Sequence, residues 1–419
     1  MKLVLKAVLL VLAAILGLVL LLTDPAPLAG PRPAPDAEQV GAARDAVLQL
    51  RPLATARDET RQVNLDAQHL DGLSALATHG LRPDRLEAFI SGSVLHVEAS
   101  RQLPLGRWLN LAAETSGSAE GFPELRIAIG SLELSPFFSR LLAETFRSGL
   151  RLAGADIPPL DELVRKVAVG EDRVSLSIDW PGDAGLLGEV LQTRSGVDPA
   201  LAVRIHCELA ERQRADPQDD LAVQVRRAFP IGRAGSATPE SNAAAFVALA
   251  MAIVDTKVGT LTGIDAAAIE ACPMPASPIA LHGREDLAKH WALSAALSVG
   301  SGTQVAEAMG EWKELADSLA SRSEFQPGDP TGFSLVDIAA DRSGFRTADA
   351  ASDPASAKAM ARRLSAARPE EILPPALLSF EEGPDVDFVG RYGSLDDPRF
   401  AGVLKKIDAV LEREGLLRP

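Results

Sequence analysis

With 419 residues, the chain is long enough for two folded domains behind a leader. Apolar residues make up 47% of it, which excludes a disordered chain, and an aromatic content of only 4% favours close helix packing over an aromatic-rich β-sandwich. The net charge of −15 excludes a nucleic-acid partner, because a phosphate backbone binds to a basic surface, and it also disfavours a broad electrostatic contact with anionic lipid.

The first element, residues 1–23, is an apolar run that only Lys6 interrupts between Leu3 and Leu22. As a helix, at about 1.5 Å per residue, this run is as long as the hydrocarbon layer of a bilayer is thick. Lys2 and Lys6 orient its amino-terminal end toward the cytoplasm. A cleaved signal peptide is the alternative, although no Ala-x-Ala site follows the run. We therefore expect a transmembrane anchor or uncleaved signal, a single pass through a bacterial inner membrane, and a body in the periplasm.

Residues 24–57 combine a Pro-rich spacer with a lead helix. Five prolines between Pro25 and Asp36 predict a stiff, extended segment that holds the body away from the membrane. The helix is expected at Ala37–Leu50, where apolar residues recur at helical spacing.

Residues 58–182 are predicted to form an α+β domain, because segments of alternating hydrophobicity flank one amphipathic helix at Pro136–Leu152. The segments expected to be strands, the first of them strand or irregular, are Thr60–Leu73, Leu86–Ala99, Trp108–Thr115, Leu125–Leu134 and Val164–Ile178. The phrase Ile127-Ala-Ile-Gly-Ser-Leu-Glu-Leu-Ser-Pro136 resembles lipid-carrying periplasmic domains of the AsmA and TULIP kinds. An ordinary half-buried sheet crossed by a helix is the alternative.

Residues 183–419 are predicted to form a mainly α-helical domain, since helical periodicity replaces alternation from Gly182 onward. The helices are expected at residues 186–194, 199–214, 221–229, 239–254, 284–299, 303–319, from 333 onward, 355–366 and 398–416. The run Ser241–Val254 is uncharged but shorter than the about 20 residues that a membrane span needs. We therefore expect it to be a buried core helix.

Three of these helices contain the main concentration of ionisable side chains at the three- or four-residue spacing of one helix face. The residues are Asp286 and His290 on the first helix, Glu314 and Asp317 on the second, and Asp337 and Asp341 on the third. The Asp286 carboxylate is placed to orient the His290 imidazole. Ser334 and Asp337 also fit a helix-capping pattern, which would account for Asp337 without any chemistry.

Three interpretations of this cluster are open. The first is a divalent-metal site, because one imidazole among carboxylates suits such an ion. Its candidate ligands are His290, Glu314, Asp317 and Asp341, with Asp337 as a further candidate. The second is acid–base chemistry on an envelope substrate, with His290 as base and Glu314 or Asp317 as acid. The third is a buried polar network that fixes how the helices pack.

The sequence contains no Gly-x-Ser-x-Gly, phosphate-loop or Cys-x-x-Cys motif, so we lean against an enzyme and expect no organic cofactor. Its two cysteines, Cys207 and Cys272, are too few for a disulfide-built scaffold. Outside the cytoplasm they could form one disulfide, and two buried thiols are the alternative.

Spaced residues within 286–344 also suggest relatives. They are Asp286-x-x-x-His290, Lys313-Glu314-x-x-Asp317 and Gly332-Phe333-Ser334-x-x-Asp337-x-x-Ala-Asp341-x-x-Gly344. This order resembles YfiM-type periplasmic lipoproteins and, more distantly, VanZ-like membrane proteins, although Asp341 stands where an Asn is common and a lipobox cysteine is lacking. The whole chain, with its segment Pro239-Glu-Ser-Asn-Ala-Ala-Ala, is similar to a family of exported proteobacterial proteins.

These resemblances imply an exported location and no mechanism. We therefore expect a membrane-anchored periplasmic envelope protein with a binding or scaffold role. Its expected partners are the inner membrane, through the leader, and an envelope protein or lipid. The alternative function is a metal-dependent or acid–base hydrolase that acts on an envelope substrate.

Overall fold

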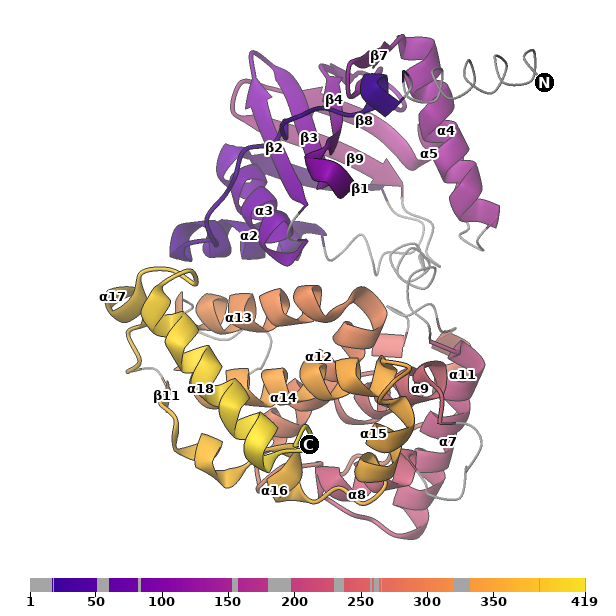
Figure 1. Ribbon diagram of the computed structural model, residues 1–419. Coiled ribbons are helices and arrows are strands. Elements are labelled where there is room, and N and C mark those ends of the chain that lie inside the picture. Colours follow the sequence, from indigo (N-terminus) through magenta and orange to yellow (C-terminus); the bar gives the residue numbers. More distant parts are fainter. Residues whose placement is uncertain are drawn as a thin grey trace, which may run out of the picture. The chain divides into compact units, whose positions relative to one another are not determined.

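Figure 1 shows the computed structural model of the chain. The structure describes residues 17, 19–50, 60–81, 84–152, 157–179, 197–229, 237–256, 258–259, 264, 266–319, 332–383 and 385–418. The chain divides into two compact units, which are residues 1–152 with 156–183 (unit 1) and residues 153–155 with 184–419 (unit 2). Both units contain helices and strands, so the mixed α and β character extends to the part predicted as mainly helical.

In the described part of unit 1, the strands form two antiparallel sheets. The larger sheet has the order β2-β3-β4-β6-β7 and the smaller one the order β1-β9-β8-β5. The strands of the larger sheet are β2 (Arg85–Ser91), β3 (Val94–Gln102), β4 (Trp108–Thr115), β6 (Arg126–Ile129) and β7 (Leu132–Leu134). Those of the smaller sheet are β1 (Thr60–Asp66), β5 (Gly117–Ser118), β8 (Val164–Val169) and β9 (Arg173–Asp179).

Glycines at positive φ divide two of the predicted β segments into hairpins. Gly92 (φ +56°) separates β2 from β3, and Gly130 (φ +56°) separates β6 from β7. A residue with a side chain rarely adopts this left-handed conformation, so glycine sets where each strand ends.

The helices of unit 1 pack around and between these sheets (Figure 1). They are α2 (Ala37–Leu50), α3 (Ala67–Gly80), α4 (Pro136–Leu152), the short α5 (Leu160–Leu163) and the 3-10 turn η2 (Pro104–Gly106). Helix α3 lies where the sequence predicted strand or irregular chain, because Asp66 caps it by accepting from the backbone N–H of His69. Leu70 of α3 then joins Val63, Leu65 and Val174 of the smaller sheet in one core.

The Pro-rich stretch packs along unit 1, although the sequence predicted a spacer. The backbone N–H of Leu28 donates to Ser100 Oγ (2.9 Å) and Asn110 Oδ1 (3.0 Å), and Ala29 is fully buried. Arg32 pairs with Asp71 at 2.5 Å. Polar groups of the body therefore satisfy the extended backbone, which has no hydrogen bonds of its own.

Unit 2 is built around helix α9 (Pro239–Ile253). Residues Asn242–Met251 are all buried, which confirms the prediction of a core helix, and α9 packs against α7, α12 and α14. The other helices are α7 (Pro199–Ala215), α8 (Leu221–Ala228), α11 (Ala266–Glu270), α12 (Glu285–Ser301), α13 (Thr303–Leu319), α14 (Leu335–Ser352), α15 (Ala357–Leu364), α16 (Pro369–Ile372), the 3-10 turn η3 (Pro375–Ser379), α17 (Phe388–Tyr392) and α18 (Pro398–Glu414). Strands β10 (Phe333–Ser334) and β11 (Glu382–Gly383) pair as a two-stranded antiparallel sheet.

Two features lock the helices of unit 2 together. A disulfide joins Cys207 of α7 to Cys272, just after α11, with 5.1 Å between the Cα atoms. Helices α12 and α14 pack closely at Gly344, where an added Cβ atom would lie 2.3 Å from the carbonyl oxygen of Trp291. Only glycine permits this approach, and it brings the polar faces of the two helices together.

Among the described residues, no helix is both long and apolar enough to cross a membrane. Most of the predicted anchor, residues 1–16 and 18, lies outside the described residues, as does the helix predicted at 186–194.

Candidate metal centre

Helices α12, α13 and α14 bring His290, Glu314, Asp337 and Asp341 to one place in unit 2. All four side chains are buried, and Glu314 is only 1% exposed. The sequence predicted this convergence from helical spacing alone. The backbone of Asp317 belongs to α13, but its side chain lies outside the described part of the structure.

One ring nitrogen of His290 faces Asp341. Nδ1 lies 3.1 Å from both Oδ1 and Oδ2 of this carboxylate. Ser294, one turn after His290 on α12, donates from Oγ to Asp341 Oδ1 at 2.6 Å. A Cβ atom on Gly310 would lie 2.9 Å from Asp341 Oδ2, so the carboxylate is also enclosed from α13. Asp341 is therefore held in position and fixes the orientation of the imidazole.

The other ring nitrogen of His290 faces two further acids and a lysine. Nε2 lies 3.4 Å from Asp337 Oδ2 and 3.8 Å from Glu314 Oε1. The ammonium of Lys313 lies 3.4 Å from Nε2 and 3.0 Å from Glu314 Oε1. The Lys313 side chain is 24% exposed, so this side of the centre is the one nearest to solvent.

The start of α14 ties Glu314 and Asp337 into the same network. Ser334 caps the helix, as predicted, by accepting from the backbone N–H of Asp337 at 3.0 Å. The backbone N–H of Ser334 donates to Glu314 Oε2 at 3.2 Å. In a capping box the Asp337 side chain would accept from the backbone N–H of Ser334, but Glu314 accepts this hydrogen bond instead. The Asp337 carboxylate faces His290 and, at 3.4 Å, Arg284. Capping therefore does not account for Asp337.

Asp286 does not orient His290, although the four-residue spacing suggested it. Its carboxylate pairs with Arg284 at 2.5 Å, and Arg284 also holds Glu382 at 2.7 Å. Ser294 and Arg284 also belong to this network, through Asp341 and Asp337, although the sequence pattern did not select them. Ser294 lies four residues after His290, so the helical spacing that selected the acids would also have found it.

Burial and neighbouring charges shift the pKa values of the centre. Burial alone would lower the pKa of His290, but the Asp341 and Asp337 carboxylates outweigh it and raise the pKa to about 9. Burial raises the pKa of Glu314 to about 7 against the opposing effect of Lys313 and His290. Burial also raises the pKa of Asp337. Near pH 7 the imidazole is therefore a cation among acids.

The donor set suits a divalent metal ion. His290, Glu314 and Asp341 each offer one ligand atom, and these atoms all lie within 4.8 Å of one another. One imidazole with carboxylates is a ligand set that zinc and manganese accept, and a carboxylate on the second ring nitrogen is a common feature of metal-bound histidine. Asp341 and Asp337 lie on opposite sides of the ring, so either can complete the set.

The fold and this centre define a protein of two mixed α and β units, one of which encloses a histidine–carboxylate cluster. No protein-family model, curated protein or solved structure matches the chain significantly. The resemblances to YfiM-type, VanZ-like, AsmA and TULIP proteins therefore stay predictions.

Proposed function

We propose that this protein is a single-pass envelope protein of the bacterial inner membrane whose periplasmic unit 2 binds a divalent metal ion. The proposed ligands are His290, Glu314 and one of Asp341 and Asp337, whichever lies at the ring nitrogen that binds the ion, and the other acid then orients the ring. The observation that most supports the metal site is the buried position of the His290 ring, which has a carboxylate at each of its two nitrogens. A role in binding is favoured over catalysis because the ring is only 7% exposed, which leaves little room beside it for an organic substrate.

In the absence of a metal, the His290 imidazolium, the Lys313 ammonium and the Arg284 guanidinium balance the acids. The Nε2 side of the His290 imidazolium faces Glu314 and Asp337, and the Lys313 ammonium pairs with Glu314. A metal ion bound here would supply the positive charge of the His290 proton and of Lys313: the imidazole would release a proton and act as a ligand, and the partly exposed Lys313 would turn toward solvent. Binding is therefore coupled to the release of a proton.

Two features support the proposed location. The leader has the length and composition of a membrane span. The second feature is the Cys207–Cys272 disulfide, because disulfides persist in oxidising compartments such as the periplasm and are rare in the cytosol.

A second candidate function is acid–base catalysis on an envelope substrate. It is favoured by one observation: burial gives Glu314 a pKa of about 7, close to the value that suits a general acid at neutral pH. A substrate would approach from the side of Lys313, which is the more exposed member of the centre. Acid–base hydrolysis of an envelope substrate that persists after chelation would favour this candidate over metal binding.

Calorimetric titration of the full-length protein in detergent with Zn²⁺ tests the metal proposal. Because the pKa of His290 is about 9, we expect the apparent dissociation constant to fall about tenfold for each pH unit between pH 7 and 8.5. His290→Gln and Glu314→Gln should each weaken binding at least tenfold.

The matched control is Asp349→Asn, which changes an exposed carboxylate two turns after Asp341 on the same helix. It should bind Zn²⁺ as the wild type does. Absence of binding to the wild type, or equal binding by His290→Gln, would contradict the proposal.

A further inference from the structure

Helix α4 of unit 1 exposes its apolar side. The exposed side chains are Phe137 (71%), Phe138 (55%), Leu141 (51%), Leu142 (38%) and Phe146 (67%). We call these five residues the α4 face. A helix on a globular domain normally buries such a stripe against the core, because the burial of apolar surface is the main driving force for packing.

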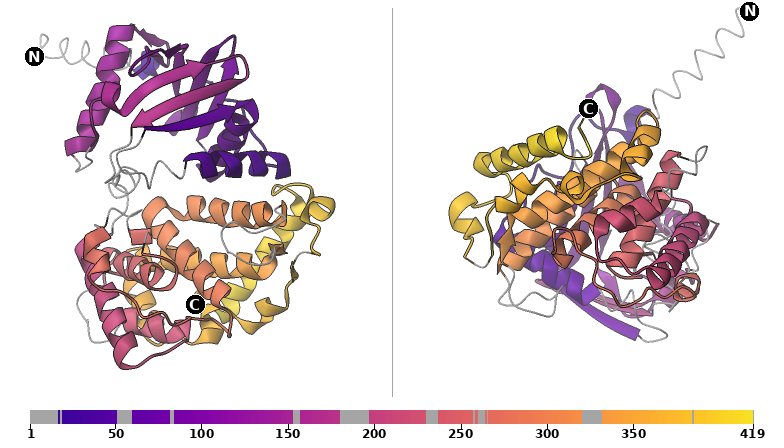
Figure 2. Two further views of the ribbon diagram at one scale, coloured as in Figure 1. Left: turned by 180° about the vertical axis from the view of Figure 1, so that it is seen from behind. Right: turned by 90° about the horizontal axis from the view of Figure 1, so that it is seen from below.

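The polar side of α4 is the side that is fixed to unit 1. Ser139 is fully buried and accepts from the backbone N–H of Ile127 at 3.2 Å. Arg140 pairs with Asp161 at 2.7 Å, and Arg147 donates to the carbonyl oxygen of Ile157 at 3.0 Å. In Figure 1 and in the left view of Figure 2, α4 forms an outer edge of unit 1. These contacts hold the helix with its apolar side outward.

The end of the apolar leader is attached next to α4. The backbone N–H of Ser131, in the β6–β7 turn, donates to the carbonyl oxygen of Leu21 at 2.9 Å. A Cβ atom on Gly130 would lie 2.6 Å from the backbone of Leu22, so the leader packs tightly against this turn. Helix α4 follows β7 directly and contacts both strands of the hairpin. One hairpin therefore holds both apolar segments.

The exposed apolar side chains of unit 1 are concentrated on the leader, the β6–β7 hairpin and α4. Among the described residues, fourteen large hydrophobic side chains are exposed, and nine of them belong to the leader, the β6–β7 hairpin or α4. The nine are Val19, Leu20, Leu21, Leu132, Phe137, Phe138, Leu141, Leu142 and Phe146. Such a concentration on one part of a soluble domain marks an interaction surface.

We propose that the α4 face lies in the lipid–water interface of the membrane that the leader enters. The continuity of the face with the leader identifies the lipid surface as the occupant, because a leader inserted in the bilayer places the hairpin and α4 at the membrane surface. Phenylalanine and leucine on one side of a helix, with arginines on the other, are typical of helices that lie in this plane. The proposal rests on the membrane anchoring proposed above and is independent of the metal centre.

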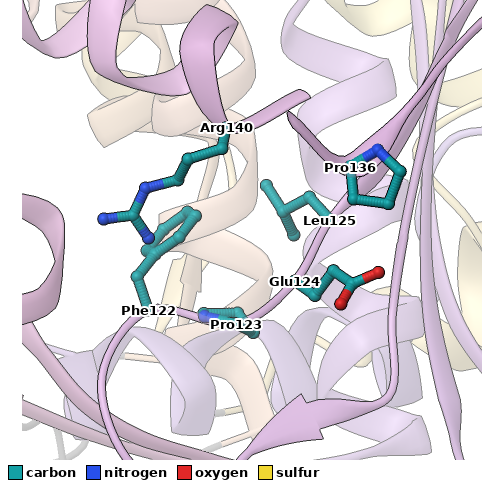
Figure 3. Close-up of a pocket in the computed structure, with 6 residues that line it drawn as sticks. All are labelled: Phe122, Pro123, Glu124, Leu125, Pro136 and Arg140. Carbon is teal, nitrogen blue, oxygen red and sulfur yellow. The ribbon is translucent and has the colours of Figure 1, made fainter. Parts of the chain in front are cut away.

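The contact is apolar rather than electrostatic. A hollow of about 220 Å³ at the start of α4 is lined by Phe122, Leu125, Pro136 and Arg140, among others (Figure 3). The Arg140 guanidinium lies over the Phe122 ring, 5.1 Å from its centroid, and is already paired with Asp161. Arg140 is therefore already paired within unit 1. We expect binding to neutral phosphatidylcholine and little dependence on salt.

The test uses the full-length protein reconstituted in phosphatidylcholine nanodiscs, one copy per disc. An environment-sensitive fluorophore is attached to a single introduced cysteine, because both native cysteines are in the disulfide. The α4 probes are Leu141→Cys and Phe146→Cys, and Leu12→Cys reports the leader. The control is Ser91→Cys, which lies at the exposed end of β2.

Quenching by a lipid that bears a nitroxide in its acyl chain is the readout. We expect at least threefold stronger quenching at residues 141 and 146 than at residue 91, unchanged between low and high salt. Adding Phe137→Glu to the Phe146→Cys variant should reduce the quenching at residue 146 to the level of residue 91. Both positions are exposed, so neither change should disturb the fold.

The outcomes separate the two proposals. Quenching at residue 12 without quenching at residues 141 and 146 overturns the α4 proposal and leaves the anchor intact. No quenching at any position overturns both. Crosslinking of α4 probes between copies in discs that hold two molecules, without lipid quenching, would assign the α4 face to self-association and also overturn the proposal.

Discussion

Unit 2 encloses a protonated imidazole and three carboxylates in a core of small apolar residues, whereas unit 1 leaves three phenylalanines on its surface. Each arrangement reverses the usual distribution of side chains, and each costs free energy in an isolated domain. In unit 2 the cost is offset locally, since every carboxylate has a hydrogen-bond donor or cation within reach. In unit 1 the five side chains of the α4 face are exposed among the described residues, and we proposed above that lipid covers them. The comparison teaches that buried charges and exposed apolar groups call for different tests: stability for the first, binding for the second.

The largest expected effect is that of removing Asp341. Asp341→Ala leaves the buried His290 cation and the Ser294 hydroxyl without their partner, so unit 2 should lose about 3–5 kcal/mol of stability. Asp349→Ala, on the exposed side of the same helix, should cost less than about 1 kcal/mol. Hydrogen exchange of the α12 amides measures both, because it reports on unit 2 separately from unit 1. Equal losses would show that the centre is not an energetically coupled network.

The stability of unit 2 should also depend on pH through His290. Its folded pKa of about 9 lies above its ordinary value of 6.5, so its contribution is complete below pH 6.5 and is lost as the pH rises through about 9. The raised pKa of Glu314 acts with the same sign but ends near pH 7. Between pH 7 and 9 we therefore expect a loss of about 2–3 kcal/mol in the metal-free protein.

His290→Gln is the reference for this measurement, because glutamine does not titrate. Urea unfolding at pH 7, 8 and 9, monitored by hydrogen exchange of the α12 amides, should show a stability that falls with pH for the wild type and stays nearly constant for the variant. A wild-type stability that rises over this range would contradict the assigned protonation of His290.

Replacing one glycine by alanine in each unit should change stability in opposite directions. Gly344→Ala should destabilise unit 2 by about 1–3 kcal/mol, because the new Cβ atom would lie 2.3 Å from the carbonyl oxygen of Trp291 and force α12 and α14 apart. Gly149→Ala on α4 should stabilise the helix by up to about 1 kcal/mol, because no atom lies within 4 Å of the new Cβ. Thermal unfolding of each variant gives the sign, and a stabilising Gly344→Ala would show that the helices can separate freely.

Local sequence signals predicted much of the fold. The bounds of α4 and α13 agree with the prediction to the residue, because Pro136 is the first residue of α4 and Gly302 directly precedes α13. Helix α3 was missed because its cap, Asp66, is also the last residue of strand β1, so one apolar stretch contains both periods. The Pro-rich stretch was predicted to be free because its partners, Ser100 and Asn110, are more than 70 residues away.

The sequence predicted four members of the candidate site, His290, Glu314, Asp337 and Asp341, but not their pairing, and it did not select Ser294 or Arg284. Helical spacing identifies residues that share a face, and this placed His290, Glu314 and Asp341 together. Which acid meets which ring nitrogen depends on how α12 crosses α14, and that depends on Gly344, whose role no local pattern reveals. The same limit applies to α4: an apolar stripe shows that one side of the helix seeks cover but does not show whether the protein core provides it.

The smallest expected effect on stability distinguishes the α4 face from an ordinary core. Phe146→Ala should change the stability of unit 1 in detergent-free solution by less than about 0.5 kcal/mol, because the ring is 67% exposed and has few contacts to lose. Phe246→Ala, the matched change in α9 of unit 2, removes a ring that is 0% exposed and should cost about 3–5 kcal/mol. Both stability losses are measured by chemical unfolding in a background whose leader has been made polar, with hydrogen exchange of the β6 and α9 amides as the readout. If Phe146→Ala proved as costly as Phe246→Ala, the α4 face would be packed against protein, and the lipid surface would no longer be needed to explain it.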